Sequence, residues 1–437
     1  RLKRIARMRH DTVTKPGQST PMPTFSLLFS AFGRIGLLSF GGPAAQIGLM
    51  HRVLVEERGW LTEKQFLSAL SFCMLLPGPE AMQLATYAGW RLRGTPGGLL
   101  AGALFVLPGA LVIAALAALY AAFGTAPQTE ALLLGVKATV IVIVVQALMR
   151  LWAKALSGRA AMGLAGFAFA ALYLFATPFP MVIAAAGLWG WLTGRAAAEE
   201  SAPPPAHAAP PLPRIALWGA LWLLPLPLLW LAGETMLFDL GLFFAKLAVV
   251  SFGGAYAVLA WMAQEVVQIR GWLTPEQMVD ALGLAETTPG PLILVTQFTG
   301  QLIGHETGGW GLALAASLLT LWMTFLPCFL WIFAFAPHLE RLLARPRLQG
   351  ALSAITAAVL GVIANLSLWF ALHVLFSDTV TAPAPLTATL PVPSSLRPEA
   401  VFLVALAALL MLKLKRSVPL TLALTALAGW ALGQLLP

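Results

Sequence analysis

Residues 39–79 read SFGGPAAQIGLMHRVLVEERGWLTEKQFLSALSFCMLLPGP. Three short motifs in this stretch recur at one common offset of 212 residues. They are Ser-Phe-Gly-Gly at 39–42 and 251–254, Gly-Trp-Leu-Thr at 59–62 and 271–274, and Pro-Gly-Pro at 77–79 and 289–291. Three coincident motifs at a single spacing are hard to obtain by chance, so the chain contains an internal duplication.

The composition places this duplication in a membrane. Of 437 residues, 59% are hydrophobic and 10% are charged, and the mean hydropathy is +0.82, whereas soluble domains carry about 25% charged residues. Runs such as 131–148 are apolar on every face, which indicates helices rather than the alternating strands of a barrel. The net charge of +9 comes mostly from Lys and Arg between apolar runs, where they set membrane orientation, and indicates no nucleic-acid surface. Cys73 and Cys328 lie inside apolar runs, so neither a disulfide framework nor a metal site is expected.

The pattern predicts an all-α polytopic membrane protein with about thirteen hydrophobic segments. They run over 25–50, 64–91, 97–123, 127–149, 160–176, 179–194, 215–232, 236–264, 276–304, 309–336, 350–376, 399–412 and 417–436. The predicted organisation is a basic cytoplasmic tail (1–24), a first transporter repeat (25–195), a Pro/Ala linker (196–213), an extra linking helix (214–233) and a second repeat (234–437) with an extended, solvated loop at 377–398.

The segment count predicts that the second repeat is inverted, because seven crossings separate the two starts. Inverted repeats with broken helices are a recurrent plan of secondary transporters. With a cytoplasmic N-terminus, every segment crossing, and the end residues Lys64 and Arg91 counted with the adjacent loops, 20 of the 27 Lys and Arg lie inside, four outside and three within segments. If the first two segments of each repeat are re-entrant, the split becomes 22 inside and two outside. Both satisfy the positive-inside rule, so spanning and re-entrant segments stay open.

Glycine and proline interrupt the first two segments of each repeat. The breaks fall at Gly41 and Gly42, at Pro77, Gly78 and Pro79, at Gly253 and Gly254, and at Pro289, Gly290 and Pro291. A break at membrane depth is tolerated only where it is buried in protein or lines a cavity. Each break also starts a new helix whose free N–H groups attract anions. We therefore expect four positive helix ends to converge on an anion.

Three cations lie within the predicted segments. Arg34 and Lys246 are repeat equivalents, and Lys137 is the third. A buried cation costs about 2.5–3.5 kcal/mol at the centre of a membrane helix, so it needs a negative partner. A snorkelling side chain or an internal salt bridge is the structural alternative. Two carboxylates, Glu80 and Glu286, lie deep within the predicted segments. Three cations against two carboxylates leave a surplus of one positive charge, which favours an anionic ligand.

The two carboxylates receive different expected roles. Glu80 follows Pro79 at a helix start, where the dipole stabilises its charge or where it acts as a simple cap. Glu286 has no such dipole, which makes it the better proton carrier. Polar side chains near the breaks could donate to an oxyanion, although each alone is more often a helix-packing group: Ser39, Ser251, Thr287, Thr288, Gln83 and Gln297.

The motifs of the first repeat resemble those of a known protein family. Residues 39–90 closely resemble the chromate ion transporter family, through Ser-Phe-Gly-Gly-Pro at 39–43, His-Arg at 51–52, Glu-Glu-Arg-Gly-Trp-Leu at 56–61 and Leu-Pro-Gly-Pro-Glu-Ala at 76–81. The likeness extends through both halves, to Thr-Pro-Gly-Pro at 288–291 and to the region around Asn365, as in the long two-domain form. One departure is that Pro43 is matched by Ala255 in the second repeat.

The resemblance implies export of chromate from the bacterial cytoplasm through the inner membrane, and so chromate resistance. By position it points to Arg34, Gly41, Gly42, Pro77, Gly78, Pro79 and Glu80, and to Lys246, Gly253, Gly254, Pro289, Gly290 and Pro291. Sulfate has nearly the same charge, size and shape as chromate, so an oxyanion transporter of other specificity stays open. Coupling to protons or counter-anions and the oligomeric state, a homodimer included, stay open too.

Two other classes of function compete with a carrier. An anion channel would use the same basic vestibule. A membrane enzyme or haem protein is disfavoured, because only His373 of six histidines lies clearly within a segment. We therefore expect no cofactor. No phosphate-binding loop of the Walker type appears, so ATP is not the direct energy source unless a partner supplies it.

Overall fold

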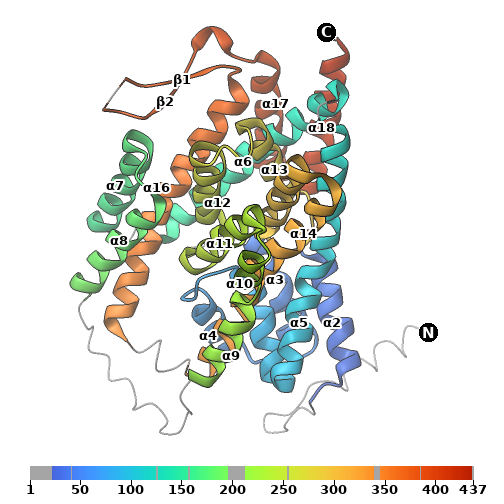
Figure 1. Ribbon diagram of the computed structural model, residues 1–437, viewed down its shortest axis with the longest axis vertical. Coiled ribbons are helices and arrows are strands. Elements are labelled where there is room, and N and C mark those ends of the chain that lie inside the picture. Colours follow the sequence, from blue (N-terminus) through green and yellow to red (C-terminus); the bar gives the residue numbers. More distant parts are fainter. Residues whose placement is uncertain are drawn as a thin grey trace.

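The computed structural model describes residues 22–40, 42–124, 126–155, 158–194, 212–252, 255–338, 345–383 and 385–435. These residues fold almost entirely into helices (Figure 1). Among them, six stretches are long and apolar enough to cross a membrane: Glu80–Phe123, Pro127–Trp152, Leu212–Leu231, Leu292–His338, Pro346–Leu375 and Val418–Leu435. The protein is a multi-pass membrane protein of the all-α class.

In the first repeat, helices end and restart at the glycine and proline motifs. α2 (Phe25–Leu38) is followed by α3 (Gly42–His51), which continues into a π-helical stretch, η1 (Arg52–Glu57). α4 (Glu63–Cys73) ends before Pro-Gly-Pro, and α5 (Glu80–Phe123) begins directly after it. A proline has no N–H to donate and clashes with the preceding turn, so it cannot continue α4.

The second repeat has the same order of elements. They are α11 (Thr235–Val250), α12 (Ala255–Ala263), the π-helical η2 (Gln264–Ile269), α13 (Pro275–Glu286), η3 (Leu292–Leu294) and α14 (Val295–Phe335), which ends in η4 (Ala336–His338). Both repeats have a capping box after Gly-Trp-Leu: Thr62 pairs with Gln65 at the start of α4, and Thr274 pairs with Gln277 at the start of α13. In Figure 1, α3 and α4 lie in the lower half of the molecule, and α12 and α13 lie in the upper half.

Each long helix after a Pro-Gly-Pro motif is two helices joined at a glycine. α5 has non-helical backbone at Arg93 and Gly94, and α14 has it at Gly308 and Gly309. Gly94 and Gly309 have φ of +64° and +74°, a region that favours glycine because it has no Cβ. The kinks fall at the predicted segment boundaries, where the sequence reads Arg-Gly-Thr-Pro and Thr-Gly-Gly-Trp.

The remaining helices follow in two groups. The first holds α6 (Pro127–Ala155), α7 (Arg159–Phe175), α8 (Phe179–Thr193), α9 (Leu212–Leu223) and α10 (Pro225–Leu231). The second holds α16 (Pro346–Leu375), α17 (Pro398–Ala408), its π-helical end η6 (Leu409–Lys413) and α18 (Val418–Leu435). Most of the 196–213 linker lies outside the described residues.

The segment 377–398, predicted to be an extended, solvated loop, contains a short hairpin, and its described residues are mostly exposed. Strands β1 (Thr379–Thr381) and β2 (Thr389–Pro391) pair antiparallel there, and a 3₁₀ turn, η5 (Pro393–Ser395), follows. The hairpin docks on the end of α7, because the Thr387 N–H donates to the Leu174 carbonyl at 2.8 Å and the Tyr173 hydroxyl donates to the Thr389 carbonyl at 2.8 Å. Among the prolines of this segment, Pro391 lies in β2, Pro393 begins η5 and Pro398 begins α17.

The two repeats exchange helices. α5 and α14 pack on each other at the centre, with α2 against α5 and α11 against α14. α6 packs against α17 and α18 of the second repeat, and α16 packs against α7 and α8 of the first. Small residues allow the close approach: a Cβ on Gly190 of α8 would lie 2.2 Å from the Gly350 carbonyl oxygen of α16, and one on Gly135 of α6 would lie 1.9 Å from the Thr425 carbonyl oxygen of α18.

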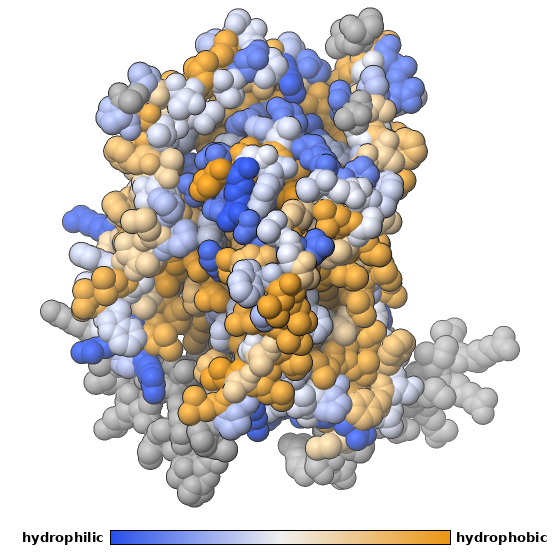
Figure 2. Space-filling model, in the orientation of Figure 1, coloured by the Kyte–Doolittle hydropathy of each residue, from blue (hydrophilic) through white to orange (hydrophobic). Residues whose placement is uncertain are grey.

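Large apolar side chains cover much of the outside. Leu111 and Phe123 of α5, Leu217 of α9 and Trp230 of α10 are among those more than half exposed. Figure 2 shows broad orange areas over α5 and α9 in the lower part of this face. A surface of this kind is stable against lipid and is unfavourable in water.

Candidate functional site

The two Pro-Gly-Pro turns bind the breaks of the opposite repeat. The Gly78 N–H donates to the Ser251 carbonyl at 3.0 Å, and the Gly290 N–H donates to the Ser39 carbonyl at 2.9 Å. Gly78 and Gly290 have φ of +116° and +90°, which only glycine adopts without strain. The buried Gln46 side chain of α3 adds a hydrogen bond to the Gly290 carbonyl at 2.6 Å. The breaks of both repeats are therefore buried against each other.

An open cavity of about 470 Å³ lies beside these crossed breaks. The starts of several helices line it: Gly42 and Pro43 of α3, Glu80 of α5, Ala255 and Tyr256 of α12, and Val418 of α18. Gln146 and Arg150 of α6 and Ser417 before α18 add to its polar lining. Helix starts present free N–H groups and the positive end of the dipole, and an arginine supplies a full charge with several donors. This arrangement suits a small oxyanion.

Of the four helix starts expected to converge, three line this cavity. The fourth, at Leu292, lines a separate apolar cavity of about 10 Å³ together with Tyr256 and Glu286. Gly41, Gly253 and Gly254 lie outside the described residues. Pro77, Gly78, Pro79, Pro289, Gly290 and Pro291 form the crossed turns and do not line the large cavity.

The structure contradicts the expectation that Arg34 and Lys246 are buried. Both side chains are exposed within the described chain. The Arg34 guanidinium lies 2.7 Å from a carboxylate oxygen of Glu57, and the Arg34 side chain is 48% exposed. The reason is the helix face: α2 buries Leu28, Ala31, Phe32 and Ile35 and leaves Arg34 on the opposite side, and Lys246 lies on the exposed stripe of α11 with Asp239 and Val249. The internal salt bridge that the sequence left open is the arrangement found for Arg34.

Lys137 is partly buried, and its ion-pair partner, Asp280, is not among the carboxylates predicted from the sequence. Its ammonium lies 3.0 Å from Oδ1 of Asp280 on α13, an ion pair by distance although Oδ1 makes no well-directed hydrogen bond. The Tyr120 hydroxyl of α5 donates to Oδ2 of the same carboxylate at 2.9 Å. Asp280 is a third carboxylate against the three cations, so the predicted surplus of one positive charge is wrong. The prediction counted only the two carboxylates next to the Pro-Gly-Pro motifs.

Arg150 also lines the cavity, although the predicted segments place it in the cytoplasmic loop after 149. The predicted segment ends at 149 because the charge reads as a boundary, whereas α6 continues to Ala155. One signal was available, since Gln146 lies one turn before Arg150 on the same helix face. Both side chains line the large cavity.

The two predicted carboxylates lie on either side of Tyr256. Glu80 stands in the first turn of α5, partly exposed, and lines the large cavity. Glu286, at the end of α13, is buried. Its Oε1 accepts a hydrogen bond from the Tyr256 hydroxyl at 2.9 Å.

The other polar candidates donate to protein atoms. Ser39, Ser251, Thr287 and Thr288 donate to backbone carbonyls three or four residues earlier. Gln83 donates to the Pro77 carbonyl at 2.6 Å, and Gln297 donates to the Ala110 carbonyl at 3.1 Å. This is the helix-packing role that the sequence reading gave as the alternative.

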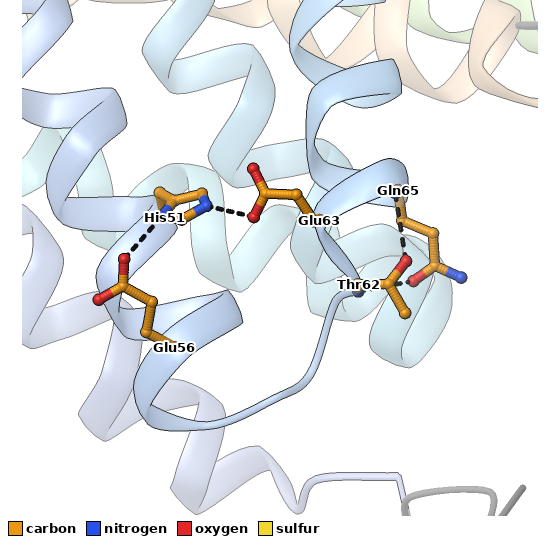
Figure 3. A network of polar contacts seen from close by, with 5 residues as sticks. All are labelled: His51, Glu56, Thr62, Glu63 and Gln65. Carbon is orange, nitrogen blue, oxygen red and sulfur yellow. Dashed lines mark hydrogen bonds and ion pairs between the residues drawn. The ribbon is translucent and has the colours of Figure 1, made fainter. Parts of the chain in front are cut away.

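A cluster of charged side chains ties η1 to the start of α4. His51 lies between two carboxylates, with Nδ1 3.1 Å from Glu56 and Nε2 2.6 Å from Glu63 (Figure 3). The hydrogen bond and charge of Glu63, opposed in part by desolvation, raise the pKa of His51 above its ordinary value. The capping pair Thr62 and Gln65 stands beside this cluster. None of these side chains lines the large cavity, and the cluster connects η1 to the start of α4.

Comparison with known proteins places the chain among transporters. The family model described as chromate transporter matches residues 26–191 and 238–430. The chain is 32% identical to the chromate transport protein of Pseudomonas aeruginosa over 431 residues, which cover 94% of each chain. It is also 32% identical to the chromate transport protein of Cupriavidus metallidurans over 361 residues, 80% of this chain and 84% of the relative.

A shorter relative matches part of the chain only. An uncharacterized transporter of Bacillus subtilis is 33% identical over 171 residues, which are 94% of its own length and 38% of this chain. The matched length is close to that of either of the two regions that the family model covers. No solved structure matches the chain.

Proposed function

The chain belongs to the chromate transporter family, and on that basis we propose that it is a secondary active transporter that exports chromate across the bacterial inner membrane and so confers chromate resistance. The cytoplasmic N-terminus belongs to the same proposal, from the distribution of Lys and Arg. The relatives named for chromate transport support the cargo, and the cavity of about 470 Å³ supports its binding site.

The observation that carries the proposal is the composition of this cavity. It joins the starts of α3, α5 and α12 to the guanidinium of Arg150. Chromate is a tetrahedral dianion whose oxygens accept hydrogen bonds from any direction. Backbone N–H groups and an arginine are donors of the required kind, and they carry positive charge without an acceptor.

The crossed turns support alternating access between two repeats. Gly78 to Ser251 and Gly290 to Ser39 are reciprocal hydrogen bonds, as expected for repeats related by a two-fold axis. The opposite placement of α4 and α13 along the long axis agrees with an inverted second repeat (Figure 1). Rocking of one repeat against the other about this contact would open the cavity to either side in turn.

The membrane potential favours export of this cargo. Moving one charge across 100 mV is worth about 2.3 kcal/mol, so a dianion leaving a negative interior gains about twice that. Proton or counter-anion coupling would add to this term, with Glu80 and Glu286 as the proposed coupling carboxylates. Arg34 and Lys246 are exposed, and we assign them to attraction of the anion toward the site rather than to its direct binding.

Two alternatives share the cavity. Sulfate or another oxyanion fits the same donors, and an anion channel would use the same positive lining. Competition of sulfate with chromate measures the selectivity. A carrier shows saturable flux that opposing substrate accelerates, whereas a channel shows neither.

The experiment is uptake of labelled chromate into everted membrane vesicles. Arg150→Gln should reduce uptake at least about tenfold, because it removes a charged donor from the cavity. The matched control is Arg159→Gln, an exposed arginine at the start of α7 that should leave uptake unchanged. Arg34→Ala and Lys246→Ala should raise the chromate concentration for half-maximal uptake without lowering the maximum. Normal uptake by Arg150→Gln would overturn the assignment of this cavity to the oxyanion.

A further inference from the structure

Tyr256 separates the large cavity from the buried carboxyl of Glu286. It is the second residue of α12, and its side chain lines both the cavity of about 470 Å³ and the apolar cavity of about 10 Å³. Its hydroxyl donates to Oε1 of Glu286 at 2.9 Å. Tyr256 therefore bonds the carboxyl on one side and borders the proposed oxyanion site on the other.

The surroundings of Glu286 are otherwise apolar. The small cavity is lined by side chains of α6, α12, η3 and α16, namely Val140, Val144, Leu259, Leu292, Leu366 and Phe370. Among the described residues, Tyr256 is the hydrogen-bonding partner found for this carboxyl. Asp280, six residues earlier on α13, is occupied by Lys137 and Tyr120. The charged groups on the cavity side of Tyr256 are Glu80 of α5 and Arg150 of α6.

We propose that Tyr256 couples the protonation of Glu286 to oxyanion binding, by switching its hydroxyl proton from the carboxylate to the anion. This inference rests on the proposed function, since it needs an oxyanion in the cavity. A tyrosine hydroxyl has one proton to donate, and an ionised carboxylate only accepts. While Glu286 is ionised, the Tyr256 proton is committed to it, as in the structure.

Protonation of Glu286 reverses the polarity of this hydrogen bond. A hydronium ion in the cavity gives a proton to the Tyr256 oxygen while the Tyr256 hydroxyl passes its own proton to a carboxylate oxygen of Glu286, and the neutral acid then donates to the Tyr256 oxygen. The hydroxyl is free to rotate its own proton toward the cavity and donate to an oxyanion there. No bond other than O–H changes. The proton also offsets part of the negative charge that the dianion brings into the cavity, so each ligand strengthens the binding of the other.

The test measures the affinity of the purified full chain for labelled chromate by equilibrium dialysis at about pH 6 and about pH 8. The wild type should bind about tenfold more tightly at the lower pH, a usual size for coupling between two sites. Chromate itself titrates in this range, but equally for every variant, so only differences between variants report on the protein.

Two variants and two matched controls give the decision. Tyr256→Phe should bind weakly, and Glu286→Gln, which keeps a neutral side chain, should bind tightly at both pH values. In both, the pH dependence should fall below that of the wild type and keep only the part caused by the titration of chromate itself. The controls are Tyr173→Phe, whose hydroxyl bonds the Thr389 carbonyl, and Glu276→Gln, exposed in the first turn of α13; both should behave as wild type.

The outcomes separate this inference from the proposed function. If the wild type binds no chromate at either pH, the proposed function fails. If the wild type binds and Glu286→Gln keeps the full pH dependence, the relay is overturned, while the oxyanion site stands. Glu286→Gln decides the matter even if Tyr256→Phe fails to fold, because its expected tight binding requires a folded protein.

Discussion

At the residue scale, ion pairs in this protein differ by their environment. Lys137 and Asp280 have side chains that are 12% and 8% exposed, whereas those of Arg34 and Glu57 are 48% and 36% exposed. Removing one partner of a buried pair leaves an uncompensated charge away from water. Removing one partner of an exposed pair leaves a charge that solvent or lipid headgroups accept. The two pairs should therefore contribute very differently to stability.

Asp280→Asn should destabilise the protein by about 3–5 kcal/mol, because the Lys137 ammonium loses its counter-charge. The double variant Lys137→Met with Asp280→Leu should recover most of the loss, since it removes both charges. Arg34→Gln is the comparison at the exposed pair and should cost no more than about 1 kcal/mol. The measurement is thermal unfolding of the purified protein in detergent. Equal losses for Asp280→Asn and Arg34→Gln would contradict this difference in burial.

At the element scale, the helix breaks depend on two glycines. The Gly78 and Gly290 N–H groups bond across the repeats, and both residues have positive φ. The space around them is limited, because a Cβ on Gly78 would lie 2.8 Å from Nε2 of Gln83 and one on Gly290 would lie 3.2 Å from Cδ1 of Leu294. Backbone conformation and packing therefore both select glycine here.

Gly78→Ala and Gly290→Ala should each destabilise the protein by about 1–3 kcal/mol, from backbone strain and lost contact between repeats. Gly48→Ala is the matched control, because Gly48 lies inside α3 with open space around its Cα. It should stabilise the protein by about 0.5–1 kcal/mol, the usual gain for alanine within a helix. Unfolding in detergent measures all three. A neutral Gly290→Ala would show that the turn tolerates a side chain.

At the scale of the whole molecule, the two repeats are held together by exchange. α6 of the first repeat packs on α17 and α18, and α16 of the second packs on α7 and α8. The last helices of each repeat therefore pack against helices of the other repeat. The shorter Bacillus relative, which matches over about one repeat length, is consistent with duplication of an ancestral unit. In a single-repeat protein, a second copy of the chain would have to supply the exchanged helices.

Inversion of the second repeat predicts the sidedness of equivalent positions. Lys64 of α4 and Glu276 of α13 are 212 residues apart, and both are exposed near a helix start. Lys64→Cys and Glu276→Cys, each in a chain with Cys73 and Cys328 replaced by Ala, should react with an impermeant maleimide from opposite sides of the membrane. Labelling of intact cells against everted vesicles separates the two sides. Reaction of both positions from one side would contradict the inverted arrangement.

The sequence by itself determined the membrane environment, the duplication and the positions where helices break. These properties depend on composition and on local backbone chemistry: apolar runs need lipid, proline cannot donate and glycine permits positive φ. The capping boxes at Thr62 and Thr274 belong to the same class. Each is encoded within a few neighbouring residues.

Only the tertiary structure decided which charges meet. Asp280 finds Lys137 from a different repeat, Arg34 is occupied by Glu57, and Arg150 reaches the cavity because α6 continues past the apparent segment end. The pairing of Tyr256 with Glu286 joins α12 to α13 in the same way. Electrostatic partners are selected by distances between helices, and a hydropathy pattern gives the faces of helices without saying which faces touch.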